Sequence, residues 1–182
     1  GYHGAVAHRG NAVARENGDQ LVFEPSAKRP DELSAVFETP AYLKPTSDVV
    51  ALLVLEHQMA VQNSLTHAGF AARRMTAYQH GLQKTFKEPE SDEPAYDSVK
   101  SVFTSSAQAV VDRLLFRHAA PLPAGITGHP AFVKKFAQGA PRSAAGHALK
   151  DLRLGERLFA QRCSYLIYSE SFRALPDTLK GR

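Results

Sequence analysis

The sequence predicts an all-α protein, an irregular bundle of four to six helices with an extended N-terminal arm. Three observations predict this class. Residues 48–83 keep a helical period without a proline. Several shorter segments with the same period follow, separated by proline and glycine. Residues 1–45 lack that period, because four glycines and four prolines interrupt them, apart from one short candidate strand at 20–23.

Length and composition favour one folded domain. The 182 residues are 43% hydrophobic, which is enough for a sizeable core. We divide the chain into an extended arm, residues 1–45, and a helical domain, residues 46–182, which we expect to be the ordered part of a longer polypeptide. One cysteine, Cys163, excludes an internal disulfide and the CxxCH motif that attaches haem covalently. We find no apolar run of the length that spans a membrane.

The stretch 48–83 is the longest helix-compatible run, and the rest of the fold is expected to form around it. Thr46, Ser47 or Asp48 is expected to cap this helix. With Val49 at 0° and about 100° per residue, its apolar side chains fill an arc from about 280° through 0° to about 140°. So wide an arc predicts a helix that is buried on most sides. Gly69 predicts a kink or the close approach of another helix.

A stripe of polar residues lies inside this apolar arc. Glu56, Asn63, His67 and Arg74 follow one another at spacings of seven, four and seven, and His57 lies beside them. A buried carboxylate or imidazole costs several kcal/mol unless it is paired. We therefore expect these side chains to have partners: one another, another helix, a metal or a cofactor.

Besides a catalytic role and a place at the rim of a partner surface, two kinds of partner remain open for the stripe. In one interpretation the residues form a hydrogen-bonded network that fixes the register of the helix. In the other, His57 or His67 ligates a metal or a haem. Neither histidine has a second ligand at i+3 or i+4, so such a site needs another segment, and His118 at the end of the next helix is the best candidate there. The candidate cofactor-binding residues are His57, His67, Glu56, Asn63, Arg74 and His118, with His57 and His67 as candidate metal ligands.

Further helices are expected after an acidic, proline-containing loop at 87–95. They are 99–118 (capped by Ser98), 130–139, 149–162 and a last one that starts at Pro176. Residues 163–169 are expected to be the buried end of the helix 149–162 or a short extended pass.

Charge is unevenly distributed along the chain. Five acidic residues lie between Glu88 and Asp97, whereas residues 134–182 hold ten Lys and Arg against four Asp and Glu. The basic part indicates a solvated face or a surface for an acidic partner protein. It contains no helix-turn-helix or aromatic-interleaved basic motif, so we do not expect nucleic-acid binding.

Three blocks of sequence resemble an uncharacterised family of exported bacterial proteins. They are YLKPTSDVVALLVLEHQ at 42–58, QGAPR at 138–142 and CSYLIYSE at 163–170. Members of that family are encoded near c-type cytochromes and periplasmic oxidation systems. The resemblance implies a periplasmic or secreted protein with redox proteins as neighbours, and a c-type cytochrome as a candidate partner.

Three classes of function follow. The favoured one is a non-catalytic component or accessory module of a periplasmic electron-transfer or oxidation system, which binds haem or metal through His57 or His67 or docks on a cytochrome. The second is a structural or protein-interaction domain with a buried polar network. The third is a helical enzyme with Glu56 or His57 as the acid–base group. The sequence lacks a nucleophile elbow, a P-loop and the GxGxxG and HExxH motifs, which places the enzyme last.

Overall fold

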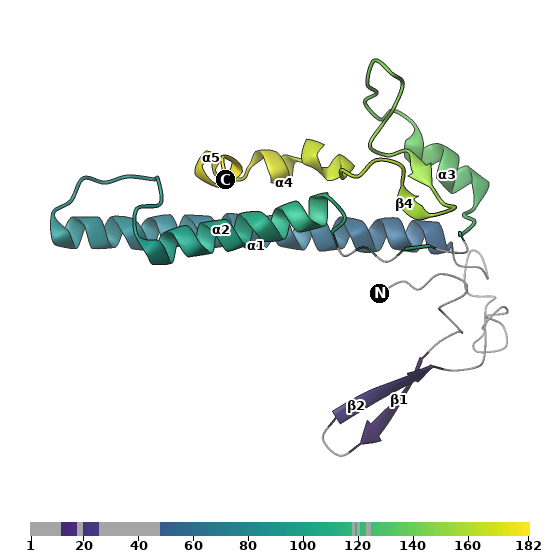
Figure 1. Cartoon of the computed structure of the whole chain (residues 1–182), viewed down its shortest axis with the longest axis horizontal. Helices are drawn as coiled ribbons and strands as arrows, with labels where there is room; N and C mark the ends of the chain where they lie inside the picture. The colour runs from purple at the N-terminus through teal and green to yellow at the C-terminus, as the bar shows by residue number, and fades with distance from the viewer. Residues whose placement is uncertain (1–11, 18–19, 26–47, 118, 120, 123–124) are drawn as a thin grey trace, which may run out of the picture. The chain divides into compact units, whose positions relative to one another are not determined.

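The computed structural model describes residues 12–17, 20–25, 48–117, 119, 121–122 and 125–182, and this part of the chain is predominantly helical (Figure 1). The predicted mainly helical class is therefore confirmed. None of the described helices combines the length and hydropathy that a membrane crossing requires. Contacts divide the chain into a first unit (Gly1–Val54, Ala120–Gly139, Leu152–Ala160) and a second unit (Leu55–Ala119, Ala140–Asp151, Gln161–Arg182).

The central helix, α1 (Val49–Phe86), is continuous over 38 residues. Asp48 caps it, because its Oδ1 accepts hydrogen bonds from the backbone N–H groups of Val50 (2.9 Å) and Ala51 (3.3 Å). This confirms the predicted start and one of the three candidate caps. The helix runs without a break through Gly69. The missing Cβ would lie 3.5 Å from Leu175 Cδ2, an ordinary contact with the segment between α4 and α5 and not with another helix.

The second unit is built on a helical hairpin. After a loop at the predicted place, α2 (Asp97–Leu114) runs back alongside α1 (Figure 1). The two helices share one apolar core, to which α2 contributes Val99, Phe103, Val110 and Leu114. The helix ends at Leu114 rather than at the predicted residue 118.

Three short helical elements complete the second unit. They are η2, a 3₁₀ helix (Tyr165–Tyr168), α4 (Glu170–Arg173) and α5 (Asp177–Lys180). Leu175 and Leu179 from this part join the core of the hairpin. Residues 163–169 are thus neither a helix end nor an extended pass, because the Ser164 side chain caps a separate turn of 3₁₀ helix. The last helix begins after Pro176, as predicted.

The predicted helix at 149–162 is wrong. This segment holds β3 (Leu152–Arg153) and β4 (Arg157–Phe159), which pair antiparallel. The order Leu-Arg-Leu-Gly-Glu-Arg-Leu-Phe explains the difference, since apolar and polar residues alternate up to a central glycine that favours a turn. The backbone carbonyls of Leu154 and Glu156 accept hydrogen bonds from Ile126 N (2.8 Å) and Leu122 N (2.9 Å), which are bonds that a helix would have excluded.

The first unit also contains a hairpin within the predicted N-terminal arm. β1 (Ala12–Asn17) and β2 (Gln20–Pro25) pair antiparallel, with Asn17 opposite Gln20. The candidate strand at 20–23 therefore exists as part of β2. The other residues of the predicted arm, 1–11, 18–19 and 26–45, lie outside the described residues.

The third predicted helix is present in the first unit as α3 (Pro130–Ala137), with proline at its first turn. The His129 side chain caps it by accepting a hydrogen bond from Ala131 N at 3.3 Å. Asp48 Oδ2 accepts a hydrogen bond from His129 N at 2.9 Å, so one carboxylate caps α1 and holds the start of α3. The rings of Phe136 and Phe159 lie 6.2 Å apart and link α3 to β4.

Candidate functional site

The buried face of α1 is turned by roughly a quarter of the helix circumference from the predicted one. Its members are small or branched apolar residues and two glutamines: Val50, Val54, Val61, Leu65, Ala68, Ala72, Gln79 and Gln83. They centre at about 120° on the helical wheel. Large apolar residues such as Leu52, Met59 and Phe70 shifted the predicted arc toward themselves, yet all three are exposed.

This rotation changes the environment of every predicted site residue. Glu56, Asn63, His67 and Arg74 are exposed, so the predicted buried stripe is wrong. His57 is half-buried and faces the core of the second unit. His118 lies outside the described residues.

The structure does not bring His57 and His67 together. Their separation of ten positions corresponds to about 15 Å along α1. Among the described residues, no three His, Cys, Asp or Glu side chains are placed to hold a metal ion. Binding of a metal or a haem by His57 or His67 stays a hypothesis, and no such group of ligands among the described residues supports it.

The corrected burial gives a direct prediction for the stripe. Glu56→Ala and His67→Ala are each expected to change the free energy of unfolding by no more than about 0.5 kcal/mol, because exposed side chains lose little on truncation. Urea denaturation of both variants beside the wild type measures this. A loss of several kcal/mol in either variant would restore the buried network.

His57 forms the polar centre of a small cluster in the second unit. Its Nε2 lies 2.8 Å from the Oγ atom of Ser164, a residue with no exposed surface. Ser164 Oγ also accepts a hydrogen bond from Leu166 N at 3.2 Å, and Ser164 N donates to the carbonyl of Leu114 at 2.8 Å. Ser164 therefore joins α1, the end of α2 and the start of η2.

Aromatic rings surround the imidazole of His57. The Phe116 ring stacks on it at a centroid distance of 4.7 Å, and the Tyr165 ring lies at 6.3 Å. Burial among these groups lowers the pKa of His57 from 6.5 to about 4, so the ring is neutral at pH 7. The Nε2 atom of a neutral ring can accept a hydrogen bond from the Ser164 hydroxyl. Ser164 Oγ can then itself accept a hydrogen bond from Leu166 N.

The end of α2 explains why Phe116 reaches His57. Arg117 N donates to Asp112 O at 2.9 Å and Phe116 N donates to Arg113 O at 3.4 Å, which is the hydrogen-bond pattern of a Schellman motif. Phe116 occupies the left-handed position of this motif with φ 55°, where glycine is the usual residue. That backbone costs on the order of 1 kcal/mol, and the ring contact with His57 offsets it.

This cluster has the composition of a structural site. Burial raises the pKa of Tyr165 to about 12, and burial also raises the pKa of the Cys163 thiol. Tyr165 and Cys163 are thus both protonated at pH 7. Ser164 is too deeply buried to meet a substrate, so its pair with His57 does not fit acyl transfer.

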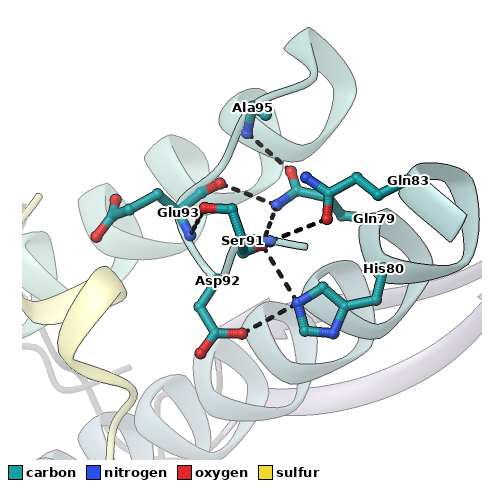
Figure 2. A network of polar contacts seen from close by, with 7 residues as sticks. All are labelled: Gln79, His80, Gln83, Ser91, Asp92, Glu93 and Ala95. Atoms are coloured by element: carbon teal, nitrogen blue, oxygen red, sulfur yellow. Dashed lines mark hydrogen bonds and ion pairs between the residues drawn. The ribbon is translucent and has the colours of Figure 1, made fainter. Parts of the chain in front are cut away.

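A second polar cluster lies at the other end of the hairpin, and sequence reasoning missed it. Gln79 and Gln83 are buried in α1 and point at the loop 91–95 (Figure 2). Gln79 Nε2 donates to the carbonyls of Ser91 (2.7 Å) and Glu93 (2.9 Å), and Gln79 Oε1 accepts from Ala95 N (2.8 Å). We call Gln79, Gln83 and the loop 91–95 the glutamine clamp.

Two further contacts complete the glutamine clamp. Gln83 Oε1 accepts a hydrogen bond from Ser91 N at 3.1 Å, and His80 Nε2 lies 3.1 Å from Asp92 Oδ1 (Figure 2). The two glutamines are four residues apart, in phase with the buried residues of α1. That spacing, directly before a loop of proline and acidic residues, is the signal that could have revealed them.

The side of α1 opposite the core is the third candidate site. Seven exposed residues follow one another there at alternating spacings of three and four: Glu56, Met59, Asn63, Thr66, Phe70, Arg73 and Ala77. We call them the outer face. Its two large apolar side chains are strongly exposed, Met59 at 57% and Phe70 at 69%.

Comparisons with protein-family models, with curated proteins and with solved structures find no match.

Proposed function

We propose that this chain is a non-catalytic, protein-binding component of a periplasmic electron-transfer or oxidation system. One observation carries the binding role: Met59 and Phe70 are exposed on the outer face of α1, whereas smaller apolar residues fill its core face. Exposing large side chains and burying small ones is unfavourable for an isolated chain, and exposed apolar residues on one face are typical of interaction sites.

The cellular setting in this proposal is supported by the resemblance of the three sequence blocks. That resemblance favours a periplasmic or secreted protein and a c-type cytochrome as a candidate partner. For the whole of this chain we propose an irregular bundle of four to six helices with an N-terminal arm. In this proposal the hydrogen bonds of the His57 cluster and of the glutamine clamp hold α1 in place, so that it presents its outer face to a partner.

A photo-crosslinking experiment tests the binding role. A photoreactive phenylalanine analogue is placed at position 70 in the natural host, with the same group at position 86 as the matched control. Phe86 is also exposed, at 61%, but lies beyond the outer face. We expect position 70 to give a discrete adduct with one protein, whereas position 86 gives none. Equal labelling at both positions, or no adduct at position 70, would contradict the proposal.

A second candidate function is haem or metal binding through His57. One observation favours it: the pKa of about 4 keeps this imidazole neutral, which is the form that ligates a metal. The hydrogen bond between His57 Nε2 and Ser164 opposes it, since a ligand at Nε2 would have to break that bond. An absorption spectrum and metal analysis of protein from the natural host separate the two candidates. A Soret band or stoichiometric metal that disappears in His57→Gln would establish the second one.

A further inference from the structure

The outer face of α1 keeps the spacing of a coiled-coil seam, with Met59, Phe70 and Ala77 as its apolar members and polar residues at its other four positions. Its seven residues, from Glu56 to Ala77, keep spacings of three and four over three heptads. A strict seven-residue repeat keeps one stripe in contact with a partner helix along its whole length. The stripe lies about 160° from the core face of α1, and its seven residues are exposed, although Arg73 at its edge also contacts Ala174.

We propose that this stripe binds the same stripe of a second copy of the chain, with the two α1 helices antiparallel. The inference rests on the proposed protein-binding role of the outer face and names the partner as a second copy. A two-fold axis between Ser64 and Leu65 places Met59 opposite Phe70 of the other copy. Sulfur–aromatic contact then buries the two large apolar residues of the stripe against each other.

Charge complementarity selects this orientation and this register. With the same two-fold axis, Glu56 of one copy faces Arg73 of the other at both ends of the seam. A parallel pair in register would instead place Glu56 against Glu56 and Arg73 against Arg73, which like charges oppose. At the centre Asn63 meets Thr66, and this polar layer can fix the register at some cost in affinity.

Arg73 is already engaged within its own copy, where its Nη1 lies 3.1 Å from the ideal Cβ position of Gly69. Its Nη2 donates to the carbonyl of Ala174 at 2.8 Å, so the guanidinium is already held in place within its own copy. A guanidinium has five N–H donors, and those not used on Ala174 can bind the carboxylate of Glu56. A held arginine loses less conformational entropy when it forms such a pair.

The first test measures self-association of the full chain by analytical ultracentrifugation. We expect a concentration-dependent dimer that Phe70→Glu weakens by about ten- to hundredfold, because a charge replaces the largest buried side chain of the seam. Phe86→Glu is the matched control and is expected to leave the dimer unchanged. A chain that stays monomeric at millimolar concentration, or a dimer that Phe70→Glu leaves intact, overturns the proposal.

A charge exchange tests the register. Glu56→Arg alone is expected to weaken the dimer by about tenfold, since it places two arginines opposite each other. Adding Arg73→Glu should recover the wild-type affinity, because each end again pairs opposite charges. If the double variant forms a dimer no tighter than that of Glu56→Arg alone, the proposed register is wrong. Thermal denaturation of the double variant checks that the loss of the bond from Arg73 to Ala174 has not unfolded it.

Distances between spin labels test the orientation. Labels at Ala77→Cys, in a Cys163→Ser background, should lie about 38 Å apart along the antiparallel pair, from the 1.5 Å rise per residue. A parallel pair would bring them within about 10 Å and overturn the proposal. The broader function fails separately: a monomer whose position 70 still crosslinks to another protein keeps the binding role without the dimer. A dimer whose position 70 crosslinks to its own copy alone keeps the inference without a heterologous partner.

Discussion

Replacing Gln79 by alanine is expected to lower the free energy of unfolding by about 3 kcal/mol. Gln79 has no exposed surface and makes three hydrogen bonds to the backbone of the loop 91–95. Alanine removes these bonds and leaves the Ala95 N–H and the Glu93 carbonyl without their partner. The Ser91 carbonyl keeps a weaker contact with His80 at 3.2 Å, which limits the loss.

Urea denaturation of Gln79→Ala beside Gln62→Ala measures this effect. Gln62 lies on the same helix but is exposed, and its side chain makes one bond of 3.3 Å to Thr66. Its loss is therefore expected to change stability by no more than about 0.5 kcal/mol. If Gln79→Ala were as stable as Gln62→Ala, the glutamine clamp would not hold the loop.

The glutamine clamp also explains how an acidic loop can connect two packed helices. α1 ends in a Schellman motif, in which Glu88 N donates to Gln83 O at 2.8 Å and Lys87 takes the left-handed position with φ 58°. Gln83 thus serves twice, through its carbonyl at the helix end and through its side chain on Ser91. The glutamine side chains fix the loop through its backbone groups, so the loop does not depend on burying its carboxylates.

The fold could be predicted from the sequence where local signals agree. The period of residues 48–83, the cap at Asp48 and the proline at the start of α3 each act within a few residues, and the structure contains all three. The segment 149–162 failed because its apolar residues fit a helix as well as two short strands. The hydrogen bonds from Leu122 and Ile126 that decide between them come from distant residues.

The candidate sites could be predicted less well, for a physical reason. A helical wheel weights each residue by its hydropathy, so exposed Phe70 counts as core and buried Gln79 counts as surface. The true core face is set by which side chains fit against Phe103 and Leu114 of α2, and small residues such as Ala68 and Ala72 fit best. The helical wheel therefore predicted the helix correctly but placed its buried face on the wrong side. As a result it predicted a buried polar stripe that is exposed, and it missed the buried glutamines of the glutamine clamp.

Acidification is expected to cost the wild type about 2 kcal/mol of stability through His57 alone, between pH 7 and pH 4. Burial lowers the pKa of His57 from 6.5 to about 4, so in this interval the unfolded chain binds a proton that the folded chain excludes. The contribution of His57 to the free energy of unfolding is therefore fully present above about pH 6.5 and is lost as the pH falls toward 4. The partial exposure of the ring keeps this loss below the full linkage value.

The comparison of two glutamine variants isolates this contribution from the carboxylates that titrate in the same range. His57→Gln can keep a hydrogen bond to Ser164 but does not titrate, so its stability should fall by about 2 kcal/mol less than that of the wild type between pH 7 and pH 4. His67→Gln, on the exposed side of α1, should follow the wild-type profile. If all three proteins lose the same free energy, the imidazole of His57 is protonated as easily in the folded chain as in water. The contacts with Phe116 and Ser164 would then not shield the imidazole of His57 from water, and this part of the second unit would have to be open to solvent.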